Sequence, residues 1–175
     1  MRGKDSGGRF SIPYERRSII NGTTKELVRT VGQEINWWRW DSGTTTIDNI
    51  YDVGSVTGGR RWKDQRPVQC VTAVIYQGVT QQNERGFYNT DLLRATLNMD
   101  VVEEFFGNMP TSPDDFLRDR IVFFGEVFRP TRFYPRGLIT DKYTLFTFDA
   151  VQVNPEEMIN DRQFTQYADP GSVPL

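Results

Sequence analysis

The sequence predicts a mainly β protein: a small β-barrel or meander with a short N-terminal helix, long loops and extended terminal arms. Its most informative stretch is residues 119–153, where runs of Val, Ile, Phe and Tyr alternate with short turn segments. Such side chains suit a pleated, half-buried surface. Several of these runs are apolar on both faces, unlike the strands of an open sheet with one wet face. We therefore expect a barrel whose outer face is covered by the N-terminal helix or by a neighbouring subunit.

Two turns divide this stretch into strands. Gly125-Glu126 is a two-residue hairpin connection, and Tyr134-Pro135-Arg136-Gly137 combines a proline that presets φ with a glycine that tolerates φ > 0. Asn154-Pro155 ends the unit. The predicted strands are residues 120–124, 127–134, 138–140 and 143–153.

Weaker patterns cover the rest of the chain. Residues 25–35 predict a helix with Leu27, Val31 and Ile35 on one face, although Gly32 weakens it. Residues 41–63 form a long irregular segment rich in Gly, Thr and Ser. The remaining expectations are strands over residues 68–76 and 92–99, a polar loop over 77–85, a short helix over 101–106, and a helix beginning at Pro155.

These patterns suggest four segments. The expected division is a flexible N-terminal arm (1–24), a short helix with a long irregular loop (25–66), a β-barrel body (67–160) and a C-terminal tail (161–175).

Composition removes several classes of function. The 175 residues include no histidine, which excludes every His-dependent catalytic triad and the commonest transition-metal ligand. Cys70 is the single cysteine, so no intrachain disulfide can form, and its apolar neighbours predict a buried thiol. No apolar run approaches the length of a spanning helix, and residues 1–8 do not resemble a secretory signal.

Charge is distributed unevenly along the chain. Residues 1–66 carry 12 Lys and Arg against 8 Asp and Glu, whereas residues 67–175 carry 9 against 15. A positive leading segment and a negative body can favour docking between unlike surfaces. Ordinary surface variation is the alternative explanation.

Two sets of residues are candidates for contacts with other molecules. Trp and Arg dominate interface hot spots, so the first set contains inter-subunit interface candidates: Trp37, Trp38, Arg39, Trp40, Arg60 and Arg61. The alternative for the tryptophans is packing onto the body of the same chain. The second set contains channel-loop candidates, whose amides can lie near passing DNA without binding it tightly: Gln77, Gln81, Gln82 and Asn83. An ordinary solvated loop is the alternative there.

The sequence offers no catalytic residues, no metal ligands and no cofactor-binding motif. Adjacent acids occur at Glu103-Glu104, Asp114-Asp115 and Glu156-Glu157, each near an expected helix start. Acids at that position interact favourably with the helix dipole. We therefore interpret them as capping residues, and we expect no enzyme activity.

Ordered sequence blocks between Trp37 and Met158 resemble the head-to-tail stopper, or head completion, proteins of long-tailed actinobacteriophages. The blocks are Gly59-Arg60-Arg61-Trp62, Arg66-Pro67-Val68, Gly86-Phe87-Tyr88-Asn89-Thr90-Asp91, Asp119-Arg120-Ile121-Val122 and Asp149-Ala150-Val151-Gln152-Val153-Asn154-Pro155-Glu156-Glu157.

This resemblance implies a structural virion protein at the head–tail neck, made in the host cytoplasm. Such proteins form a homo-oligomeric ring, expected here to hold six or twelve copies, with the portal and adaptor ring above and the tail terminator and tail tube below. Packaged double-stranded DNA passes through the lumen without sequence-specific binding, and no membrane is involved. The family supplies no catalytic residues.

Two other functions stay open. A tail terminator ring protein would favour a mixed α/β sheet. A single-stranded nucleic-acid-binding β-barrel would need aromatic strands and a basic groove, and the acidic balance of residues 67–175 counts against it.

Overall fold

The computed structural model describes residues 14, 17–45, 47–48, 53–54, 59–83, 86–107, 116–139 and 142–167. Of the expected N-terminal arm (1–24) and C-terminal tail (161–175), residues 1–13, 15–16 and 168–175 lie outside the described residues, as do the tip of the predicted 77–85 loop and the pair Asp114-Asp115.

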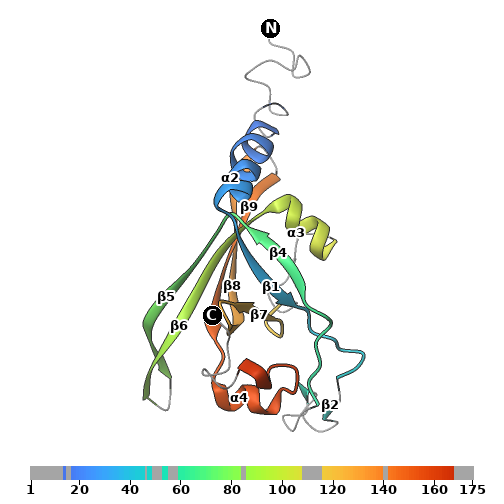
Figure 1. The fold of residues 1–175 in the computed structure, drawn as a ribbon, viewed down its shortest axis with the longest axis vertical. Helices are drawn as coiled ribbons and strands as arrows, with labels where there is room; N and C mark the ends of the chain where they lie inside the picture. Colours follow the sequence, from blue (N-terminus) through green and yellow to red (C-terminus); the bar gives the residue numbers. More distant parts are fainter. Residues whose placement is uncertain are drawn as a thin grey trace.

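A seven-stranded antiparallel sheet forms the body of the molecule (Figure 1), which confirms the mainly β class. In sheet order its strands are β4 (Arg66–Cys70), β1 (Gln33–Trp38), β7 (Arg120–Phe123), β8 (Glu126–Ile139), β9 (Lys142–Gln152), β6 (Gly86–Asn98) and β5 (Thr72–Asn83). Two short strands, β2 (Ile47–Asp48) and β3 (Val53–Gly54), pair separately.

The sheet is open, so the expected closed barrel is wrong. Strands β4 and β5 follow one another with only Val71 between them, yet β4 pairs with β1 and β5 pairs with β6 at the two edges. The Val71 amide donates to the Thr96 carbonyl at 2.8 Å, where the chain bends from one edge toward the other. This bend curls the sheet without completing its ladder of hydrogen bonds.

Local turn chemistry explains the β7–β8 hairpin and corrects one predicted turn. Phe124 and Gly125 have φ of 49° and 79°, and positive φ at both central residues is the geometry of a type I′ turn. The turn is therefore one residue earlier than Gly125-Glu126. At the predicted second turn, β8 instead continues through Pro135 and Gly137, paired with β9, and Gly137 takes a positive φ of 66°.

Short helices occupy the strand connections and the C-terminal side. The π-helix η1 (Ser18–Thr24) leads into α2 (Lys25–Val31), which ends at Gly32. The predicted helix was too long, because Ile35 lies in strand β1 and not on a helix face. Helices α3 (Met99–Phe106) and α4 (Pro155–Asn160) confirm the two predicted short helices, and η3 (Thr165–Tyr167) follows.

Hydrophobic clusters lie on both faces of the sheet. On the face that we call inner, Trp37, Phe128 and Phe148 pack with Val102 of α3. On the opposite, outer face, Val122 and Val127 pack with other side chains of a second cluster: Trp62, Val153, Met158 and Phe164. The chain thus covers part of its outer face with its own C-terminal segment, and not with the N-terminal helix that was expected.

Candidate functional site

The first predicted interface residue, Trp37, is a core residue. It lies on the inner face of β1 with no exposed surface, and its ring contacts Phe106 and Phe148 at centroid distances of 5.3 and 5.1 Å. Its indole Nε1 donates to Oδ2 of Asp119 at 2.8 Å. A side chain without exposed surface cannot contact another chain, so the interface prediction is wrong for Trp37.

Trp38 and Trp40 are only partly buried, and each packs against an aromatic ring of the same chain. The ring centroids of Trp38 and Phe164 lie 5.1 Å apart, and those of Trp40 and Trp62 lie 5.3 Å apart in an edge-on arrangement. Trp40 and Trp62 also form an isolated backbone bridge, which ties the end of β1 to the segment before β4. Their role in contacts between subunits stays a prediction.

Asp119 organises this junction from a fully buried position. Besides Trp37, its carboxylate accepts the backbone N–H of Trp40 at 2.8 Å and lies 3.3 Å from Nε of Arg39. Burial raises the pKa of Asp119 to about 6, against the opposing effect of these donors. The sequence analysis names Asp119 only within a resembling block. Its position directly before strand β7 was the available sequence signal for a structural role of this acid.

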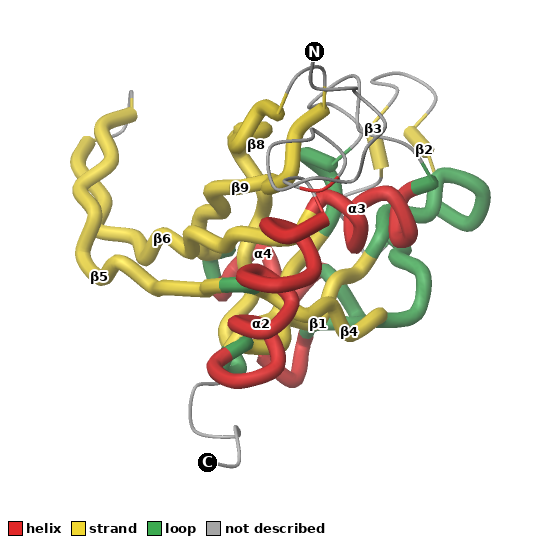
Figure 2. The backbone as a smooth tube through the Cα atoms, turned by 90° about the horizontal axis from the view of Figure 1, so that it is seen from above, coloured by secondary structure: helices red, strands yellow, loops and turns green. Residues whose placement is uncertain are grey.

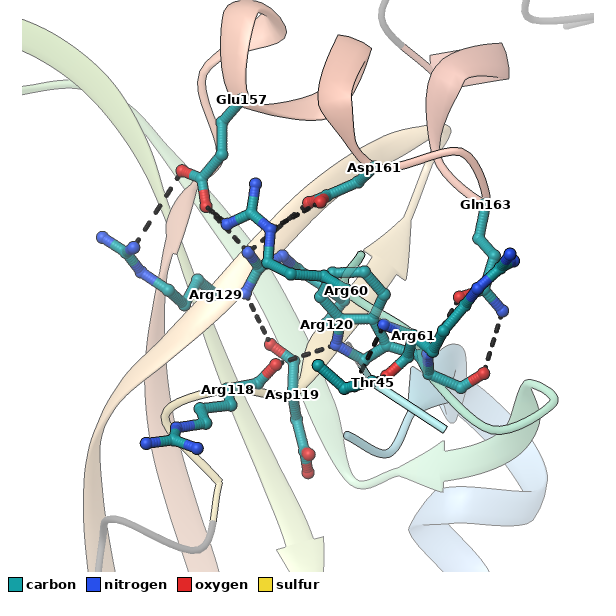
Figure 3. A network of polar contacts seen from close by, with 11 residues as sticks. Thr45, Arg60, Arg61, Arg118, Asp119, Arg120, Arg129, Glu157, Asp161 and Gln163 are labelled. Atoms are coloured by element: carbon teal, nitrogen blue, oxygen red, sulfur yellow. Dashed lines mark hydrogen bonds and ion pairs between the residues drawn. The ribbon is translucent and has the colours of Figure 1, made fainter. Parts of the chain in front are cut away.

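Arg60 and Arg120 meet two acids beneath α4 in what we call the ion-pair cluster: Arg60, Arg120, Glu157 and Asp161 (Figure 3). Arg60 Nε lies 2.7 Å from Asp161 Oδ1, and Arg120 Nη2 lies 2.8 Å from Glu157 Oε1. Arg120 is 4% exposed and Asp161 is 1% exposed as side chains. Desolvation lowers the pKa of Arg120 to about 10 and raises the pKa of Asp161.

The ion-pair cluster bears on two predictions: the interface role of Arg60 and Arg61, and the capping role of the paired acids. Arg60 uses its charge within the chain, whereas Arg61, its neighbour, is exposed, and their contacts with another subunit stay predictions. Glu157 lies in the first turn of α4, as the capping interpretation expects, and it also pairs with arginines. Glu103 and Glu104 lie beyond the first turn of α3, so the capping interpretation is wrong for them.

A pocket of about 390 Å³ lies beside this junction, between β1, the segment before β4 and α3. Three cations and one acid line it, with aromatic rings as walls: Arg39, Lys63, Arg66, Asp64, Trp40, Phe105 and Phe106. The guanidinium of Arg39 stacks 4.8 Å from the Phe106 ring centroid. This lining favours an anionic group over a metal ion.

The channel-loop candidates lie on a strand and not in a loop. The C-terminal half of β5 contains all four: Gln77, Gln81, Gln82 and Asn83. Strand β5 pairs with β6 as far as Asn83 and Gly86. Gln77 is exposed. The sequence missed this strand because polar amides and Gly78 suggest a loop, whereas a register shift between Tyr76 and Val79 accommodates them within the hairpin.

Among the described strands, residues 86–91 of β6 pair only with β5. Strand β9 pairs with β6 only over Leu92–Asn98 of β6. The outer parts of β5 and β6 therefore leave the body as a two-stranded arm, residues 77–83 and 86–91 (Figures 1 and 2). We refer to this segment as the β5–β6 arm.

The described part of the chain offers few side chains suited to metal binding or nucleophilic catalysis. No group of three or more His, Cys, Asp or Glu side chains there could hold a metal ion. Cys70 is fully buried, as predicted, and burial raises the pKa of its thiol to about 12, which keeps it protonated. Among the described helices, none has the length and apolar character to cross a membrane.

Comparisons with known proteins give a distant likeness among solved structures. No model of a protein family matches the chain, and no curated protein matches it. Among solved structures, a chain of "Virion of native gene transfer agent (GTA) particle" is similar, with 13% identity and a TM-score of 0.41, over 69% of this chain and 94% of that one. At this level the likeness carries no argument about fold or function.

Proposed function

We propose that this chain is a structural virion protein, a stopper that forms a ring in the head–tail connector of a phage. In this role it joins the portal and adaptor to the tail and helps retain packaged double-stranded DNA. The proposal begins from the sequence blocks that resemble such proteins. It expects a ring of six or twelve copies, because stacked rings around a DNA channel require cyclic symmetry.

The β5–β6 arm is the observation that carries the proposal. A two-stranded hairpin with no further strand beside it is at best marginally stable in water. An arm of this length therefore favours a protein whose hairpin meets another molecule in its working state. In a ring, such an arm can reach a neighbouring copy or the lumen, and its amides at Gln77, Gln81 and Gln82 suit a surface past which DNA must slide.

The resembling sequence blocks also converge in space. Arg60 comes from the first block, Arg120 from the fourth and Glu157 from the last, and all three meet in the ion-pair cluster (Figure 3). The blocks thus specify how the segment before β4, strand β7 and helix α4 fit together. This favours a resemblance of fold over a chance likeness of scattered surface residues.

Two alternatives make different predictions. A tail terminator fits less well, because the sheet is antiparallel throughout and its helices are short. A single-stranded nucleic-acid-binding protein gains one favourable feature, an exposed sheet face with arginines and tyrosines such as Arg94 and Tyr76.

Native mass spectrometry of the chain with its neighbouring portal, adaptor and tail proteins tests the proposal. We expect a closed ring of defined copy number bound between them. A chain that stays monomeric with all of these proteins present would contradict the proposal. Tight, salt-sensitive binding of single-stranded oligonucleotides by that monomer would support the nucleic-acid alternative.

A further inference from the structure

The outer face of the sheet is divided into a covered half and an exposed half. Under α4, the outer-facing side chains of β7 and the start of β8 are buried, as Val122 and Val127 show. Farther along the sheet, on β8, β6 and β5, large outer-facing side chains are exposed instead. Val74 is 47% exposed and Tyr76 is 46% exposed.

Strand register places four arginines on this exposed half. Arg94 of β6 is opposite Val74 on one side and Asp149 on the other, and Asp149 is opposite Arg132 of β8. Arg129 and Arg136 lie on the same strand as Arg132, and all four arginines are exposed. We call this surface the arginine face: Val74, Tyr76, Arg94, Arg129, Arg132 and Arg136.

Cross-strand contacts hold the arginine face in a fixed shape. Arg94 forms a two-pronged pair with Asp149, with Nε–Oδ1 and Nη2–Oδ2 distances of 2.7 and 3.0 Å. The Tyr134 hydroxyl donates to the same carboxylate at 3.1 Å, and the Arg94 guanidinium lies 5.7 Å from the Tyr76 ring centroid. The face is therefore a preorganised, positively charged surface with apolar groups at its edge, which lowers the ordering cost of binding.

An acidic surface of the same chain lies on the other side of the sheet. Helix α3 packs its apolar residues, including Val102, onto the inner face, and this leaves Glu103 and Glu104 exposed in solvent. Asp100 stands on the same helix and pairs with Lys25 at 3.2 Å. Figures 1 and 2 both place α3 on the side of the body away from β5.

We propose that the arginine face of one copy docks onto the acidic surface of α3 in a second copy. The two surfaces are different patches with complementary charge, so the contact is head-to-tail, the kind that closes into a ring when its rotation permits. The inference deepens the proposed ring function by naming its subunit interface. The docking itself requires contact between only two copies of the chain.

Nucleic acid is the competing occupant, and the arginine face favours protein. Phosphates would neutralise the arginines and a base would stack on Tyr76, but the aliphatic Val74 would stay exposed to water. A helix surface can cover these apolar groups while Glu103 and Glu104 reach the arginines. Burial of apolar area together with paired charge is the combination that stable protein interfaces show.

Charge reversal on each side tests the docking. Self-association of the full chain is measured by sedimentation velocity at low ionic strength for Arg132→Glu/Arg136→Glu and for Glu103→Arg/Glu104→Arg. Each double variant should weaken association at least about tenfold, because like charges then face each other. An equimolar mixture of the two variants should restore association, since each supplies the surface that the other has lost.

Matched controls separate docking from general charge effects. Arg29→Glu/Arg162→Glu changes two exposed arginines outside both surfaces and should associate like the wild type. Val74→Asn tests the apolar part at an exposed position, where folding is not at risk, and should also weaken association. Circular dichroism of every variant confirms that the fold is retained.

Several results would overturn the proposal. A wild-type chain that stays monomeric, equal losses in the control variant, or no recovery in the mixture would each do so. Binding of a single-stranded oligonucleotide that depends on Arg132 and Arg136 but not on Glu103 and Glu104 would assign the arginine face to nucleic acid. Normal rings from the charge-reversed variants with their neighbouring proteins would reject this interface and leave the ring function standing.

Discussion

Asp119 has the most consequential environment of any single side chain described in the protein. Its buried carboxylate connects Trp37 of the core, the Trp40 amide and Arg39 at the edge of the pocket. Removal of a buried acceptor leaves its donors without partners, which costs more than the hydrogen bonds contribute on balance. Asp119 therefore fixes the end of β1 against the start of β7.

The raised pKa of Asp119 predicts a specific pH dependence. The folded protein binds this proton more tightly than the unfolded chain, with a pKa of about 6 against 3.8. The contribution of this group to stability is therefore present below pH 4 and is lost as the pH rises through 6. Relative to Asp119→Asn, the wild-type free energy of unfolding should increase by on the order of 3 kcal/mol from pH 7 to pH 4.

Urea titrations of both proteins across this pH range provide the measurement. The matched control is Asp64→Asn, which changes an exposed carboxylate and should show no such trend. A constant difference between wild type and Asp119→Asn at all pH values would show that this carboxylate is not held in its raised-pKa state.

At the scale of elements, the ion-pair cluster attaches α4 to the sheet. Arg120 of β7 and Arg60 of the segment before β4 both reach acids of the C-terminal segment, Glu157 and Asp161. A helix of six residues is too short to be stable alone. The cluster and the apolar contacts of Met158 therefore hold α4 in place.

Replacement of the central arginine should release this helix. Arg120→Met removes a buried cation and leaves Asp161 with Arg60, and Glu157 with Arg60 and the more distant, exposed Arg129. The free energy of unfolding should therefore fall by about 3 kcal/mol. Hydrogen exchange should show the loss of protection first in α4, residues 155–160. Thermal denaturation and exchange of the full chain measure the two effects.

Arg129→Met is the control for this experiment. Arg129 lies at the edge of the same cluster, 4.0 Å from Glu157, with a side chain that is 49% exposed. An exposed pair of this kind contributes little, so the change should stay within about 0.5 kcal/mol. Similar losses for Arg120→Met and Arg129→Met would mean that burial does not set the strength of the cluster.

At the scale of the whole molecule, the chain combines a self-covered core with a projecting arm. Hydrophobic clusters on both faces of the sheet are closed by α3, α4 and the Trp62–Phe164 contact. Apolar side chains on two faces of a strand thus do not by themselves require a neighbouring subunit. The need for a partner rests instead on the β5–β6 arm and the exposed arginine face.

The β5–β6 arm should gain protection on assembly. In the free chain its amide hydrogens, at residues 77–83 and 86–91, should exchange rapidly, because the two strands there pair only with each other among the described strands. In the assembled connector they should become protected. Hydrogen exchange on both forms tests this, with β9 as the internal control that stays protected, and equal rates in the arm in both forms would count against a role in assembly.

Local side-chain preference was sufficient to predict several elements. The strands around residues 120–123 and 143–152, the short helix α3, the Pro155 helix start and the buried Cys70 all follow from patterns within about ten residues. Where a local signal was absent or misleading, the prediction was wrong. Pro135 and Gly137 suggest a turn, but β8 stays paired with β9 on both sides of them, with a positive φ of 66° at Gly137.

The sequence by itself determined that this protein is mainly β and that it lacks histidine chemistry, because strand propensity and composition are properties of the residues alone. Only the tertiary structure decided that the sheet stays open, that Trp37 belongs to the core, and that Arg60 and Arg120 share the acids of the C-terminal segment. Those features join residues that are 37 to 101 positions apart. The free energy of such contacts depends on burial and geometry that no local pattern encodes.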